Sequence, residues 1–282
     1  MIRIIPKLDI KNENLVKGVN LEGLRVLGDP DYFAESYYEN GADEIIYHDV
    51  VASLYERNID LSLIEKASKK TFVPLIVGGG ITNLSQVEKI LKSGADRVFI
   101  NTAGINNQKF IKKVISQFGA STVVVSIEVV KKKKNYFCRK DFGREETNLE
   151  LIEWCKKLET MGVVELIVTS IDKDGTGEGF DLDIARQLNK HVKIDYILNG
   201  GFSKLEHFTD ILNICKPSGF AIGSALHYSI LKHKIGSQKH DGNFEFLKKK
   251  TQFHNFKKIS INDIKKFLIK KKILNLEINE TN

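Results

Sequence analysis

The sequence predicts an α/β fold, a parallel (β/α)8 TIM barrel with a twofold internal repeat. Two observations lead to this fold class. Short apolar runs of strand length alternate with amphipathic helical stretches along the chain. Several landmarks also recur at a spacing of about 120 residues, close to half the chain. A doubly wound sheet shows the same alternation, but it has no reason to repeat in two equal halves, so the barrel is favoured.

The repeat is clearest around two glycine pairs. Residues 75–82 (LIVGGGIT) and 197–203 (ILNGGFS) each end an apolar run in paired glycines followed by a hydroxyl residue, and Gly80 aligns with Gly201. Three further pairs of segments align at nearly the same spacing: 41–49 with 162–170, 99–103 with 221–225, and 8–9 with 127–128. We therefore expect two half-barrels of similar structure.

Each half supplies alternating strands and helices. The strands are predicted at Ile2–Ile10, Glu44–Asp49, Val73–Val77, Arg97–Asn101, Thr122–Val130, Glu165–Ser170, Tyr196–Leu198 and Gly219–Gly223. Helices are predicted at Asp31–Asn40, Leu61–Lys69, Leu84–Ser93, Asn107–Phe118, Leu149–Met161, Asp181–Asn189 and Lys204–Cys215. Gly41, Gly94 and Gly162 stand where a helix that precedes a strand commonly ends in glycine.

Composition limits the class of protein. With 282 residues, 42% of them apolar, the chain suits one barrel domain over 1–282, with a basic insertion at about 231–258 before the last helix. The net charge of +7 gathers in the C-terminal part, 229–282, which carries 13 Lys and 5 Asp or Glu, and no nucleic-acid-binding motif accompanies it. No apolar run is long enough to cross a membrane. Cys138, Cys155 and Cys215 form no CxxC pair, so we expect a cytoplasmic protein without disulfides, metal or cofactor.

Two matching anion sites are predicted at the ends of the strands. In such a barrel the chemistry gathers on the loops that follow the strands. Glycine lets backbone N–H groups approach an oxyanion closely, and a neighbouring hydroxyl adds a donor. One site would consist of Gly79, Gly80, Asn101 and Thr102, and the other of Gly200, Gly201, Gly223 and Ser224. Together they predict a substrate with a phosphate at each end. The alternative is a set of tight turns without a ligand.

Two carboxylates occupy equivalent places between those sites. Asp9 and Glu128 lie inside apolar strand segments, where a carboxyl group is costly to bury without a role or a partner. Opposed carboxyls in different environments can divide acid and base roles. The alternative is a pair of structural salt bridges, and Lys7 and Lys17 are candidate partners for Asp9.

A set of charged residues is predicted at the opposite ends of the strands. Arg3, Glu44, Arg97 and Glu165 each stand at or near the beginning of a strand, so the four side chains can form a neutral ring at the barrel bottom. On physical grounds alone, a charge layer that only stabilises the barrel explains the same residues.

These motifs resemble one known family, the cyclase subunit of imidazole glycerol phosphate synthase in histidine biosynthesis. The resemblance covers 1–228 and, more loosely, a closing helix near 260–272. It is carried by 3–6 (RIIP), 8–9 (LD), 16–20 (VKGVN), 28–30 (GDP), 49–53 (DVVAS), 77–81 (VGGGI), 100–103 (INTA), 169–176 (TSIDKDGT) and 199–202 (NGGF). The phosphoribosyl isomerase of the same pathway shares the barrel, but the VKGVN and DVVAS segments favour the cyclase.

The resemblance implies a lyase that takes ammonia from a separate glutaminase subunit docked on the N-terminal barrel face. Ammonia would pass along the barrel axis to a bis-phosphorylated ribulosyl aminoimidazole carboxamide ribotide and close its imidazole ring. Asp9 matches the family's general acid and Glu128 its general base, while Arg3, Glu44, Arg97 and Glu165 match its ammonia gate. Lys17 matches a mobile-loop lysine, and Thr169, Asp174 and Gly175 fall in the substrate-binding motif.

Three departures favour an alternative. Glu128 stands where the family has aspartate, Lys7 replaces a small neutral residue, and the segment at about 231–258 is extra. These features resemble a paralogous group that works with surface-polysaccharide amidation enzymes, where the barrel would conduct ammonia to a sugar amidotransferase. In that case the aromatic residues of the segment, Phe244, Phe246, Phe253 and Phe256, would form a docking surface. A helix packed against the barrel itself is the alternative for that segment.

Overall fold

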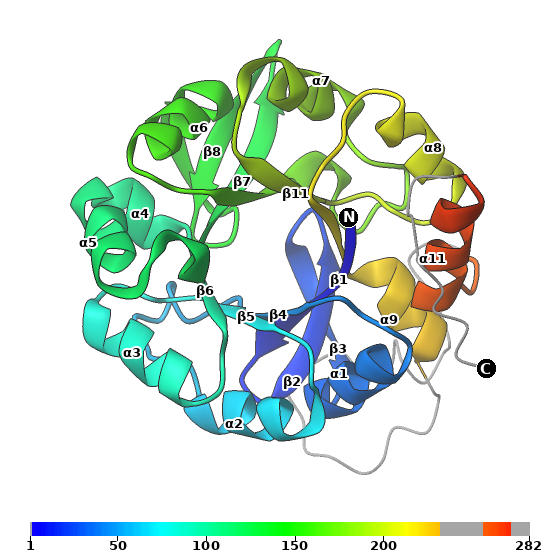
Figure 1. Ribbon diagram of the computed structural model, residues 1–282, viewed down its shortest axis with the longest axis horizontal. Helices are drawn as coiled ribbons and strands as arrows, with labels where there is room; N and C mark the ends of the chain where they lie inside the picture. Colours follow the sequence, from blue (N-terminus) through cyan, green and yellow to red (C-terminus); the bar gives the residue numbers. More distant parts are fainter. Residues whose placement is uncertain (1, 232–255, 272–282) are drawn as a thin grey trace, which may run out of the picture.

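A closed parallel barrel forms the centre of the computed structural model, which describes residues 2–231 and 256–271 (Figure 1). Its strands are β1 (Arg3–Lys11), β4 (Ile45–Asp49), β5 (Leu75–Gly78), β6 (Arg97–Ile100), β7 (Val123–Lys132), β10 (Glu165–Ser170), β11 (Asp195–Asn199) and β12 (Gly219–Ile222). Each pairs in parallel with the next in this order, and β12 pairs with β1 to close the ring. The predicted fold class and its strands are confirmed.

Helices surround the barrel on its outside (Figure 1). They are α1 (Pro30–Glu39), α2 (Leu61–Lys70), α3 (Leu84–Lys92), α4 (Thr102–Asn106), α5 (Gln108–Phe118), α6 (Leu151–Thr160), α7 (Leu182–His191), α8 (Glu206–Leu212), α9 (Ser224–Ile230) and α11 (Ile261–Lys270). Two 3-10 turns, η1 (Ala120–Thr122) and η2 (Ile171–Lys173), connect them to strands. Within the described ranges, no helix is long and apolar enough to cross a membrane.

Two antiparallel hairpins were not predicted. The first, β2 (Asn14–Val19) and β3 (Glu22–Gly28), extends from β1, and the second, β8 (Asn135–Lys140) and β9 (Glu145–Glu150), extends from β7. Because β1 and β7 begin the two half-barrels, the repeat includes the hairpins. The predicted start of a helix at Leu149 is wrong, since Leu149 belongs to β9 and α6 begins at Leu151. Residues in the left-handed region at both turns, such as Asn20 and Asp141, are typical of tight hairpins.

An apolar layer fills the middle of the barrel. Every barrel strand contributes one buried side chain to it: Ile5, Ile46, Ile76, Phe99, Val124, Ile167, Ile197 and Ala221. Such a layer is a packed core and not an open pore. It separates the charged residues at the N-terminal ends of the strands from the polar residues at their C-terminal ends.

Most of the predicted insertion at about 231–258, including Phe244, Phe246 and Phe253, lies outside the described residues. Phe256 is described, and its ring stacks on Tyr228 of α9 with centroids 5.4 Å apart. Only 8% of Phe256 is exposed. This aromatic side chain therefore packs against the barrel's own helical layer and does not belong to an exposed docking surface.

Candidate active site at the C-terminal end of the barrel

Asp9 and Glu128 occupy equivalent positions in the two halves. In the parallel ladders, Asp9 of β1 lies beside His48 of β4, and Glu128 of β7 lies beside Thr169 of β10. Both carboxyl groups are buried, with 1% and 4% of the residue exposed. The sequence therefore predicted correctly that the two carboxylates stand at matching strand ends, but their surroundings differ.

Asp9 is surrounded by cationic side chains. Lys7 Nζ donates a hydrogen bond to Asp9 Oδ1, and Lys17 Nζ lies 3.1 Å from Oδ2. His48 Nδ1 is 3.6 Å from Oδ1. Burial by itself raises the pKa of Asp9, but the ammonium groups of Lys7 and Lys17 outweigh it and hold the pKa well below its usual range. The salt bridges proposed as the structural alternative are thus present.

Lys17 joins Asp9 to the loop that follows β10. Its Nζ lies 2.7 Å from Asp174 Oδ2, and 3% of the residue is exposed. The β2–β3 hairpin that carries Lys17 also packs on this loop, since Asn20 N donates to Asp174 O over 2.8 Å. A side chain at Gly175 would collide with the backbone, because a Cβ there would lie 2.4 Å from Gly18 O. The hairpin therefore covers this side of the barrel end.

Glu128 has few charged neighbours. Its Oε2 accepts hydrogen bonds from Asn101 Nδ2 at 3.2 Å and from Gly143 N at 3.0 Å. Burial raises the pKa of Glu128 to about 7, although Lys7 opposes the shift. Near neutral pH this carboxyl group can therefore accept or release a proton, whereas Asp9 remains ionised.

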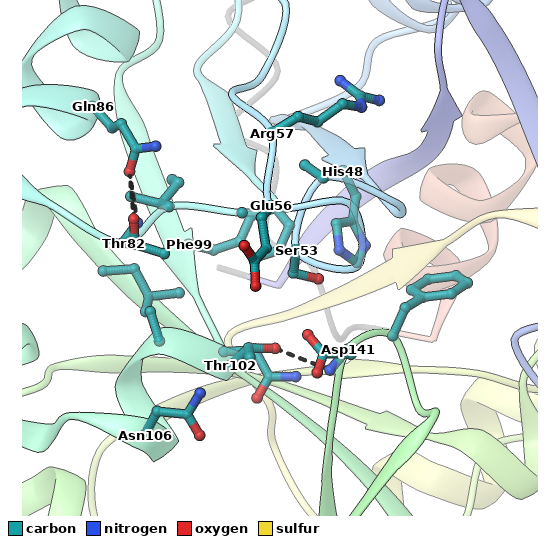
Figure 2. Close-up of a pocket in the computed structure, with 18 of the residues that line it drawn as sticks. His48, Ser53, Glu56, Arg57, Thr82, Gln86, Phe99, Thr102, Asn106 and Asp141 are labelled. Carbon is teal, nitrogen blue, oxygen red and sulfur yellow. Dashed lines mark hydrogen bonds between the residues drawn. The ribbon is translucent and has the colours of Figure 1, made fainter.

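The first predicted anion site borders a cavity of about 400 Å³. Gly79, Gly80, Asn101 and Thr102 line it, together with Glu128, as predicted from their strand-end positions. Figure 2 shows further side chains around the same cavity that the sequence did not predict: His48, Ser53, Glu56, Arg57, Thr82, Gln86, Phe99, Asn106 and Asp141. Asp9 is not among the lining residues, because Lys7, Lys17 and His48 cover it.

The second predicted anion site is much smaller. Asp174, Gly175, Gly200, Gly201, Gly223 and Ser224 do line a common cavity, but its volume is about 10 Å³, close to the space of a single water molecule. Gly201 is needed here for packing, since a Cβ would lie 1.9 Å from Gly179 O. Thr169, in the interior, accepts a hydrogen bond from Asn199 Nδ2 at 3.0 Å. The two sites match in residue type but not in volume.

The four predicted charged residues form a closed ring at the N-terminal end of the barrel. Arg3 bonds to Glu44 through Nη1 at 2.7 Å and to Glu165 through Nη2. Arg97 Nη1 lies 2.6 Å from Glu165 Oε2 and 3.9 Å from Glu44 Oε2. Burial raises the pKa of Glu165, but the two arginines outweigh it and lower the pKa below its usual value. The ring lies below the apolar layer, on the barrel axis.

Two of the residues near the site were missed because they belong to an unpredicted hairpin. Asp141 and Phe142 lie at the turn of the β8–β9 hairpin, so they could not be placed near the site without predicting that hairpin. The short apolar run at 136–138 (YFC), followed by Asp141 and Gly143, was the available signal. No group of three His, Cys, Asp or Glu side chains in the described part of the chain is arranged to hold a metal ion.

Comparison with known proteins places the chain in a family. The family model for histidine biosynthesis proteins matches residues 3–232. The imidazole glycerol phosphate synthase subunit HisF of Legionella pneumophila is 44% identical over 208 residues, which are 73% of this chain and 98% of the relative. The HisF subunits of Sulfurisphaera tokodaii and Clostridium botulinum (strain Okra) are 41% and 40% identical, each over 82% of this chain and 92% of the relative. The chain belongs to the histidine biosynthesis protein family.

Proposed function

We propose that this protein is the cyclase subunit of imidazole glycerol phosphate synthase, a lyase that works with a partner glutaminase. It uses ammonia to convert the bis-phosphorylated ribulosyl aminoimidazole carboxamide ribotide into imidazole glycerol phosphate and aminoimidazole carboxamide ribotide. The observation that carries this proposal is Glu128, a buried carboxyl with a pKa near 7 that lines the cavity at the end of the barrel. The HisF name of the relatives supports the same assignment.

Ammonia would travel along the barrel axis. The ring of Arg3, Glu44, Arg97 and Glu165 stands at the N-terminal end, where the glutaminase would dock, and the apolar layer follows it. Neutral ammonia loses less hydration than ammonium on entering an apolar layer, and the packed side chains of the layer would part to let it pass. The ring would act as a gate, because its ion pairs must part for a molecule to enter.

The substrate would lie across the C-terminal end of the barrel. One phosphate would bind at Gly79, Gly80, Asn101 and Thr102, where the larger cavity lies. The other would bind at Gly200, Gly201, Gly223 and Ser224, with Lys17, Thr169, Asp174 and Gly175 close to it. The small volume of the second site requires the β2–β3 hairpin, which carries Lys17, to move when this phosphate enters.

Proton transfer would be divided between the two halves. Glu128 would act as the general base, since a pKa of about 7 leaves much of it ionised at neutral pH. Asp9 was expected to be the general acid, but its lysine partners hold it ionised. We therefore assign the donor role to the Lys7–Asp9 pair, in which Lys7 Nζ donates a hydrogen bond to Asp9 Oδ1 and is oriented by it.

Turnover with free ammonia tests this function. The purified chain should release aminoimidazole carboxamide ribotide from the bis-phosphate substrate when ammonium salt is supplied, and adding the glutaminase should allow glutamine to replace it. Asp9→Asn and Glu128→Gln should each abolish turnover, whereas Asp183→Asn, an exposed carboxylate on α7, should not. No turnover by the wild-type chain with either ammonia source would refute the cyclase assignment.

A second function has one observation in its favour. The Lys7–Asp9 contact holds Asp9 ionised, although the resemblance to the cyclase family implied that this carboxyl is the general acid. A barrel that only conducts ammonia to a sugar amidotransferase in surface-polysaccharide biosynthesis would not need that acid. Under this alternative, the chain and its glutaminase would support glutamine-dependent amidation of a sugar, and Glu128→Gln would leave that activity intact. Deleting 232–257 would then abolish binding to the sugar amidotransferase.

A further inference from the structure

The turn between β8 and β9 reaches over the first anion site. Asp141, Phe142 and Gly143 all adopt left-handed backbone conformations, with φ of 51°, 56° and 78°. This conformation is unfavourable for residues other than glycine, so the surrounding contacts must hold the turn in place. One such contact is the hydrogen bond from Asp141 N to Thr102 Oγ1, 3.0 Å long (Figure 2).

The side chain of Asp141 lies at the cavity of the first anion site. It lines the same cavity as Gly79, Gly80, Ser53 and Thr102, and the backbone N–H of Asp141 donates to Thr102 Oγ1 over 3.0 Å. Figure 2 shows Asp141 beside Thr102, joined to it by this hydrogen bond. Hydroxyl donors and glycine backbones are the groups expected to hold a phosphate, and here an acidic side chain of the chain itself lines the cavity beside them.

The charges around the cavity also oppose a phosphate. Glu56, Glu128 and Asp141 line it. Among the described lining residues, Arg57 carries the one positive charge, and its Nη2 lies 2.9 Å from Asp49 Oδ2. A phosphate dianion placed here would therefore meet negative charge without an unpaired cation to balance it. The repulsion between close charges is strong where water is largely excluded.

We propose that Asp141 is a built-in occupant of the first anion site, and that it determines what this site admits. A phosphate group enters only when the β8–β9 turn carries the Asp141 carboxylate away from Ser53 and Thr102. The inference deepens the proposed function, on which it rests for the phosphate-bearing substrate. It identifies Asp141 as a specificity-determining residue that lowers affinity for anions until the turn moves.

Movement of this turn also uncovers the reacting groups. Phe142 packs edge-on against His48, with ring centroids 5.3 Å apart, and lies 5.8 Å from Lys7 Nζ. Gly143 N donates a hydrogen bond to Glu128 over 3.0 Å. Displacing Asp141 by phosphate therefore also shifts the residues that cover Lys7 and bond to Glu128. Phosphate binding and access to the carboxyl groups are linked through three consecutive residues.

Titration of the full chain with inorganic phosphate tests the proposal. Binding is followed by the amide NMR signals of Gly79, Gly80 and Thr102. The test variant is Asp141→Asn, because asparagine tolerates the left-handed conformation and keeps the N–H donor. We expect its dissociation constant for phosphate at this site to be at least about tenfold lower than that of the wild type, as removal of one close charge predicts.

A matched control removes the same charge from the same hairpin. Glu146 pairs with Lys132 and Arg139 and does not line the cavity. Glu146→Gln should therefore change phosphate affinity by less than about twofold, since exposed pairs couple weakly to distant sites. Adding Thr102→Val to Asp141→Asn should remove the gain, which would assign it to this site.

The outcomes are distinct. If Asp141→Asn and Asp141→Gly both bind phosphate no more tightly than the wild type, Asp141 does not control the site and the proposal is wrong. Asp141→Gly covers the case in which the asparagine amide itself alters the turn. The measurement needs no turnover, so tighter phosphate binding without cyclase activity would support the role of Asp141 and refute only the proposed reaction.

Discussion

The Lys7 ammonium group contacts the Asp9 carboxylate inside the barrel, two residues along the same strand. Residues two apart in a strand face the same side, so both point to the barrel interior. The equivalent position in the second half, two residues before Glu128, is Ser126. At this position the two halves therefore differ by one positive charge, because Lys7 corresponds to Ser126. Asp9 is held ionised, whereas Glu128 has a pKa of about 7.

Lys7→Ser places at position 7 the residue type that the second half has at the equivalent position, Ser126. We expect it to raise the pKa of Asp9 and to lower the free energy of unfolding by about 3 kcal/mol, since one partner of a buried pair is lost. A carboxyl whose pKa is lower in the folded than in the unfolded state stabilises the fold at pH values above its unfolded-state pKa. This stabilisation is lost as the pH falls through its folded-state pKa. In Lys7→Ser the loss should begin at higher pH. Urea unfolding from pH 7 to pH 2 checks this, with the exposed Lys112→Ser as control.

Glu128→Gln should have the opposite effect on stability. The folded state raises the pKa of Glu128 from 4.5 to about 7, so ionisation opposes folding increasingly as pH rises through this interval. The variant should be more stable than the wild type by about 3 kcal/mol at pH 8 and nearly equal to it at pH 4. Thermal or urea unfolding at the two pH values measures this. Equal stability at pH 8 would mean that Glu128 is ionised without cost.

The activity of the wild type should follow the same titration. If Glu128 is the general base, kcat with free ammonia should rise with pH and reach half its maximum near pH 7, where half of the carboxyl is ionised. Glu128→Asp, which shortens the side chain, should move this midpoint. A flat profile between pH 6 and pH 8 would contradict the role of Glu128 as base.

Arg97→Met tests the ring as a gate. It removes the contact of 2.6 Å to Glu165, on the face opposite to the cavity. Turnover with glutamine should fall about tenfold relative to turnover with free ammonia, which corresponds to about 1.4 kcal/mol on a barrier. Arg186→Met, on the exposed side of α7, is the control. Equal losses with both ammonia sources would indicate a purely structural ring.

Gly201→Ala should destabilise the protein more than Gly119→Ala. Both glycines have positive φ, 94° and 89°. A Cβ at position 201 would lie 1.9 Å from Gly179 O, whereas a Cβ at position 119 would have no close neighbour among the described residues, apart from its adjacent residues in the chain. We expect a loss of about 3 kcal/mol at 201 and about 1 kcal/mol at 119. Urea unfolding measures both. Similar losses of stability in both variants would show that the backbone at Gly179 can shift to make room for the added methyl group.

The barrel itself could be predicted from the sequence. Apolar runs such as those ending at Asp49 and Ser170 can form buried parallel strands, and the glycine pairs at 79–80 and 200–201 mark their ends. Since the C-terminal ends of parallel strands meet at one end of a barrel, the candidate residues could be grouped without coordinates. By the same reasoning, the four charged residues at the N-terminal ends of the strands could be grouped into a ring.

What only the tertiary structure decided depends on neighbours far apart in the sequence. Lys17 meets Asp174, and the turn at Asp141 meets Thr102, through two hairpins that the apolar pattern did not reveal. Equivalent positions led to an expectation of equivalent anion sites, but cavity volume depends on how loops pack. The different pKa values of Asp9 and Glu128 arise from burial and nearby charge, which are properties of the folded chain and not of residue spacing.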